Sequence, residues 1–150
     1  MTRPLSVYLI YFAFAYVGML ILFAIISMII SSAGSSGTVL GPFLAALIIG
    51  GLFVKNEKRA PNLQDRKVLT WGSFAIFILL NAALIALAIF GGAFAELQVD
   101  SDGARIVMIF LGIALCVIGP IVFFMMRWAY GGLARKQAVK LYGEQANTFD

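Results

Sequence analysis

The chain has 150 residues, of which 62% are hydrophobic and only 12% are charged. A soluble domain of this size cannot bury so much apolar surface, whereas lipid accepts it as solvent, so the composition predicts an integral membrane protein. The net charge of +4 does not indicate nucleic-acid binding, because the basic residues cluster beside apolar runs. With no histidine and a single cysteine, Cys116, the chain lacks the commonest metal ligand and cannot form an internal disulfide.

The first apolar run covers residues 5–30 and contains no charge. As a helix it would be roughly 39 Å long, more than the ~30 Å hydrocarbon core, so we expect a retained helix that tilts or protrudes. Four aromatic residues crowd its first half. We interpret them as an interfacial belt combined with helix packing, and the alternative is a ligand-stacking surface. The four residues are Tyr8, Tyr11, Phe12 and Tyr16.

The second apolar run covers residues 38–54 and follows an uncharged turn predicted at 31–37. It carries two small-xxx-small pairs, which let a neighbouring backbone approach closely. We therefore predict that the second helix is central in a bundle. The small residues concerned are Gly41, Ala45, Ala46 and Gly50.

The third apolar run, residues 68–95, contains one strongly polar side chain near its middle, Asn81. Ser73 and Phe77 share a helical face with it. We predict that Asn81 makes a hydrogen bond to another helix, and the alternative is a polar contact in a pore or substrate site.

An acidic turn at 96–103 leads to the fourth apolar run, residues 106–126, in which Pro120 should kink the helix. The tail, residues 127–150, has an expected break at Gly131–Gly132 followed by an amphipathic stretch at 133–145. That stretch is predicted either to lie on the bilayer surface or to extend the fourth helix.

A polar connector at residues 55–67 separates the second and third runs and carries five of the basic residues. Of the 11 lysine and arginine residues, all but Arg105 fall in this connector, the N-terminal segment or the tail. Lysine and arginine accumulate on the cytoplasmic side of membranes, so both termini and the connector are predicted to be cytoplasmic.

The connector also has the sequence of a helix start. Asn62 is a suitable N-cap, Asp65 stands at the third helical position of a capping box, and Pro61 prevents the helix from extending backwards. Four basic residues are candidate contacts for lipid phosphates or a partner carboxylate: Lys58, Arg59, Arg66 and Lys67. The alternative is that they only determine topology, in which case Arg59 and Lys58 should be interchangeable.

The predicted spans contain no aspartate, glutamate, lysine, arginine or histidine, and such residues mark proton relays and coupled transport. We find no nucleophile with an adjacent base, no metal-ligand cluster and no phosphate-binding glycine loop. We therefore predict a protein that is not an enzyme and has no cofactor.

Part of the chain resembles a known family. Gly50-Gly51-Leu52-Phe53, then Arg59-Ala60-Pro61, then the acidic Asp65, are similar to small, uncharacterised bacterial four-pass inner-membrane proteins with an Arg-x-Pro-x-x-x-acid cytoplasmic connector. Asp65 stands where we would expect glutamate, which leaves the capping chemistry intact. The resemblance implies a bacterial inner membrane and no particular activity.

These observations predict a single all-α domain, a four-helix transmembrane bundle. We expect a non-catalytic accessory or partner-binding subunit, or an immunity-type protein that blocks a membrane-targeting toxin. The alternative is an oligomeric channel or passive facilitator for a small solute, with Ser27, Ser73 and Asn81 lining a polar path. Expected partners are membrane lipids and either a membrane protein or further copies of the chain, but not nucleic acid.

Overall fold

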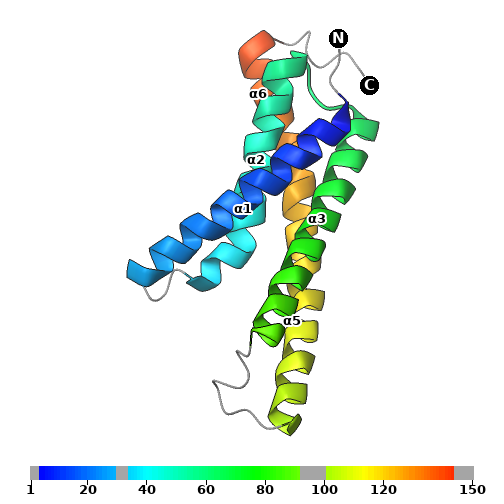
Figure 1. Ribbon diagram of the computed structural model, residues 1–150. Coiled ribbons are helices and arrows are strands. Elements are labelled where there is room, and N and C mark those ends of the chain that lie inside the picture. The colour runs from blue at the N-terminus through cyan, green and yellow to red at the C-terminus, as the bar shows by residue number, and fades with distance from the viewer. Residues whose placement is uncertain (1–3, 30–33, 92–100, 144–150) are drawn as a thin grey trace.

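The computed structural model describes residues 4–29, 34–91 and 101–143. The described chain is helical throughout, without strands, and runs α1 (Leu5–Ile29), α2 (Gly34–Glu57), α3 (Leu63–Phe90) and α5 (Ser101–Trp128) (Figure 1). A π-helical turn, η1 (Ala129–Leu133), joins α5 to α6 (Ala134–Tyr142). Four helical stretches are long and apolar enough to cross a membrane, so the chain is a multi-pass all-α membrane protein, as predicted.

The helices form two antiparallel pairs that meet at one end of the molecule. The start of α1, the end of α2, the start of α3 and all of α6 lie at this end, which we call the connector end (Figure 1). At the opposite end, the far end, the α1–α2 pair and the α3–α5 pair point away from each other (Figure 1). The bundle is therefore closed at the connector end and open at the far end.

Small residues make α2 the central helix. A Cβ atom at Gly41 would lie 3.5 Å from the Tyr16 ring of α1, and one at Gly50 would lie 3.7 Å from the Ala129 carbonyl oxygen of η1. Ala45 and Ala46 are fully buried between these two positions. Because α2 contacts α1, α5, η1 and α6, the predicted central position is confirmed.

The aromatic residues of α1 face the protein core. Tyr8, Phe12 and Tyr16 follow one another at i, i+4 spacing and are completely buried, whereas Tyr11 is partly exposed. The packing part of the prediction is thus confirmed, and the belt part is wrong for the three buried rings. The aromatic residues that do face outward include Trp71 of α3 and Trp128 of α5.

Several helices begin earlier than their predicted spans. α2 starts at Gly34, so the predicted turn at 31–37 is wrong from residue 34 onward, and α3 starts at Leu63 because its capping box carries the helix back into the connector. α5 already includes Ser101 and remains helical through Pro120. The rest of the predicted acidic turn, residues 96–100, and residues 30–33 and 92–95 lie outside the described residues.

The tail continues the fourth helix. The expected break at Gly131–Gly132 is absent, and the chain passes through η1 into α6 without leaving the helix. Ala134 and Ala138 are buried with Val54 of α2. Of the two predicted alternatives, the structure shows the extension.

Candidate functional site: the connector network

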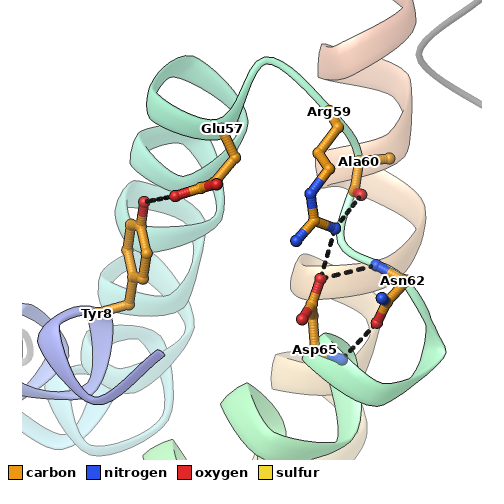
Figure 2. A network of polar contacts seen from close by, with 6 residues as sticks. All are labelled: Tyr8, Glu57, Arg59, Ala60, Asn62 and Asp65. Carbon is orange, nitrogen blue, oxygen red and sulfur yellow. Dashed lines mark hydrogen bonds and ion pairs between the residues drawn. The ribbon is translucent and has the colours of Figure 1, made fainter. Parts of the chain in front are cut away.

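The connector ends in a capping box at the start of α3 (Figure 2). The Asp65 backbone N–H donates to Asn62 Oδ1 at 2.7 Å, and the Asn62 backbone N–H donates to Asp65 Oδ2 at 3.2 Å. Two backbone donors at the helix start, which have no partner within the helix, are thereby satisfied reciprocally. The predicted capping box is confirmed.

Arg59 completes this arrangement from within the connector. Its Nη1 donates to Asp65 Oδ2 at 2.6 Å and lies 3.5 Å from the Ala60 carbonyl oxygen (Figure 2). Its guanidinium also lies over the Phe53 ring of α2, 5.2 Å from the ring centroid. One side chain thus links the end of α2 to the start of α3.

The same end of α2 is also linked to α1. The Tyr8 hydroxyl of α1 donates to Glu57 Oε1 at 3.1 Å (Figure 2). The Tyr8 and Phe53 rings have centroids 5.2 Å apart. Phe53 therefore contacts both Tyr8 and Arg59. We call these residues the connector network: Tyr8, Phe53, Glu57, Arg59, Asn62 and Asp65.

The network brings together the residues that carried the family resemblance. The aromatic residue at the end of α2 (Phe53), the arginine (Arg59) and the acid (Asp65) are in mutual contact, directly or through the guanidinium. Glu57 and Tyr8 were missed, because a pairing across 49 positions leaves no local signal in the sequence. With Asp65 accepting from both Arg59 and Asn62, this carboxylate is engaged in structure rather than available as a base.

The four basic candidates have different surroundings. Lys58 and Lys67 are exposed, and Lys58 ends α2 in the left-handed conformation with φ 54°. Arg59 is paired with Asp65, and Arg66 is half-buried against Gly131 of η1. The structure thus gives Arg59 an internal partner that Lys58 does not share, which argues against the interchangeability considered above.

The polar side chains inside the bundle make bonds between helices. Asn81 Nδ2 donates to the Tyr16 hydroxyl at 2.9 Å and to the Phe77 carbonyl oxygen at 2.8 Å, so the predicted interhelical bond is confirmed. Ser73 Oγ and the Tyr130 hydroxyl share a buried hydrogen bond of 2.8 Å between α3 and η1. Neither contact involves an aspartate, glutamate, lysine, arginine or histidine side chain.

Within one copy of the chain, the three side chains expected to line a polar path lie apart, and the oligomeric channel stays a prediction. Ser73 is completely buried against Tyr130, while Asn81 lies two turns away with Tyr16 as its partner. Ser27 is half-buried in the far half of α1 and donates to the Ala24 carbonyl oxygen of its own helix. These three side chains therefore do not converge.

One buried polar group was not anticipated. Thr70 is almost completely buried, and in the described part of the chain its hydroxyl has no hydrogen-bond partner. It lies between Arg66 and Ser73 along α3, on the side that faces η1. A threonine in an apolar run gives no sequence signal that its hydroxyl will be buried unpaired.

Residues 4–29, 34–91 and 101–143 contain no group of three histidine, cysteine, aspartate or glutamate side chains placed to hold a metal ion. Comparisons with protein-family models, curated proteins and solved structures found no match to this chain.

Proposed function

We propose that this chain is a non-catalytic, partner-binding subunit of a bacterial inner membrane, with both termini and the connector in the cytoplasm. The orientation is supported by the positions of the lysine and arginine residues, which gather at the connector end. Its partner is either another membrane protein or a further copy of the chain. The immunity-type role described above is one form of this proposal.

The observation that carries the proposal is that the helices bury apolar side chains in their connector halves and expose them in their far halves. In α1 the last buried residue is Tyr16, in α3 it is Phe77, and α5 has no buried residue before Gly119 among the side chains described. Beyond these positions each of the three helices presents large exposed apolar side chains, including Met28, Leu87 and Ile109. Helix association in lipid depends on packing and polar contacts, so the far halves are the surfaces left for another helix.

Photo-crosslinking in living cells tests this function with a matched pair of sites on α3. Leu87 and Trp71 are about equally exposed, at 68% and 62%, but lie in the far half and the connector half. A photoreactive phenylalanine at Leu87 should give a discrete protein adduct, and the same group at Trp71 should give none. Mass spectrometry of the adduct distinguishes a partner from a second copy.

Two outcomes would count against the proposal. Absence of any adduct at Leu87 and at other exposed far-half positions, with normal expression, would mean that only lipid covers this surface. Adducts of equal yield at Leu87 and Trp71 would mean that association does not use the far halves.

A further inference from the structure

Arg66 lies in an unusually close contact with the π-helical turn. Its guanidinium packs against Gly131, where a Cβ atom would come within 2.6 Å of Cζ and 2.9 Å of Nε. No residue other than glycine leaves room for the guanidinium in this position. The Arg66 guanidinium therefore rests directly on the Gly131 backbone, and we call this position the Gly131 seat.

Among the residues that the structure describes, the Arg66 guanidinium has no polar partner. Across residues 4–29, 34–91 and 101–143 the Arg66 side chain makes no hydrogen bond and no ion pair. The adjacent carboxylate, Asp65, is occupied by Arg59 and by the backbone of Asn62. A half-buried guanidinium thus keeps its five N–H donors available for an acceptor from outside the chain.

The position of Arg66 along the helices indicates where that acceptor would come from. Trp71 follows it by five residues on α3, and Trp128 precedes Gly131 by three residues on α5, and both indole rings are exposed. Exposed tryptophans are enriched where the hydrocarbon meets the headgroups. Arg66 and Gly131 lie one turn outward from them, roughly 5–8 Å along the helix axis, at the depth of the lipid phosphates.

The exposed charged residues nearest to Arg66 and Gly131 along α3 and α5 are both positive. Lys67 is next to Arg66 and exposed, and Arg127 is one turn before Gly131 and exposed. An anion approaching from the headgroup layer is therefore attracted by neighbouring charges and then meets the planar guanidinium. Guanidinium binds a phosphate through two parallel hydrogen bonds, which a lysine ammonium cannot reproduce.

We propose that Arg66, held on Gly131, binds the phosphate group of an anionic phospholipid at the junction of α3 and η1. The recognised chemistry is a phosphate oxyanion, and its source is the headgroup layer in which Arg66 lies. The inference depends on the placement of the chain in a membrane and is independent of the proposed protein partner. Failure of the crosslinking experiment would leave it untouched.

Lipid binding to the purified full-length protein tests the site. Detergent-solubilised protein is titrated with phosphatidylglycerol and, separately, phosphatidylcholine, and native mass spectrometry follows the first lipid bound. Arg66→Gln should weaken the first phosphatidylglycerol about tenfold, whereas Lys67→Gln should change it less than about twofold, because an exposed charge contributes little. Equal losses in the two variants would show diffuse attraction and overturn the proposal.

A second variant keeps every charge and alters only the seat. In Gly131→Ala the new methyl group must displace the flexible end of Arg66, so the protein should retain its helical content while losing phosphatidylglycerol affinity to a similar degree. Wild-type affinity in Gly131→Ala would overturn the seated geometry. Inorganic phosphate is added as a competitor, and displacement of the lipid at equal concentration would assign the site to a free anion instead.

Discussion

The connector half and the far half of the bundle are built from similar apolar helices but are held together very differently. The connector half contains the buried residues of α1, α3 and α5 together with the connector network. In the far half, the described side chains of these three helices are exposed or half-exposed, and the two helix pairs point apart (Figure 1). Apolar character alone does not determine which half closes.

The difference shows what holds helices together in lipid. Hydrocarbon solvates leucine as well as a protein core does, so closure requires close packing and polar bonds. The connector half has both: small residues along α2, interlocking rings, and hydrogen bonds at Tyr8, Arg59 and Ser73. Towards the far end, the Asn81–Tyr16 hydrogen bond joins α3 to α1.

Replacing one phenylalanine by alanine in each half tests whether the connector half is closed and the far half open. Phe12 is completely buried, whereas Phe90 is 89% exposed. Phe12→Ala should lower the free energy of unfolding by about 3 kcal/mol, because it leaves a cavity, and Phe90→Ala should change it by less than about 0.5 kcal/mol. Reversible unfolding in mixed detergent micelles measures both, and similar losses would contradict a closed and an open half.

A smaller loss of stability is expected when the Asp65 carboxylate of the connector network is removed. Asp65→Ala removes the carboxylate that accepts from the Asn62 backbone N–H in the capping box, and it leaves the Arg59 guanidinium without its ion pair. We expect the free energy of unfolding to fall by about 2 kcal/mol. Asp65→Glu is the control, because glutamate at this position also closes a capping box. The same unfolding assay applies, and a loss in Asp65→Glu as large as in Asp65→Ala would show that the cap and ion pair are not what matters.

The smallest expected effect is at the boundary between the halves. Removing the Asn81–Tyr16 hydrogen bond should cost about 0.6 kcal/mol, in line with interhelical bonds in membranes. A double-mutant cycle with Asn81→Leu and Tyr16→Phe isolates the coupling energy. A coupling energy of zero would mean that this bond contributes nothing to holding α1 against α3. The boundary between the halves would then lie closer to the connector end.

The sequence predicted the parts of the fold that have local causes. The helices follow from long apolar runs, and the capping box follows from Asn62 and Asp65 three positions apart. The central place of α2 could be predicted because its small residues recur at helical spacing. Asn81 was predictable as an interhelical donor because it is a lone amide in an apolar run.

Other features depend on packing that the sequence does not reveal. α1 is apolar on every side, so its hydrophobic pattern could not show that Tyr8, Phe12 and Tyr16 face inward. The pairing of Arg59 with Asp65 depends on the path of the connector from α2 into α3, which includes Lys58 in the left-handed conformation and Pro61. The contact of Arg66 with Gly131 depends on a π-helical turn, which two glycines in sequence suggested only as a break.

The uninterrupted passage from α5 through η1 into α6 has a mechanical consequence. From Ser101 to Tyr142 the chain forms one rod of roughly 60 Å, about twice the thickness of the hydrocarbon core. Tyr130, which lies nearer the connector-end tip of this rod than its far end, is joined to Ser73, so this contact can act as a pivot. A sideways displacement of the rod at the far end would then swing α6 in the opposite direction on the other side of the membrane.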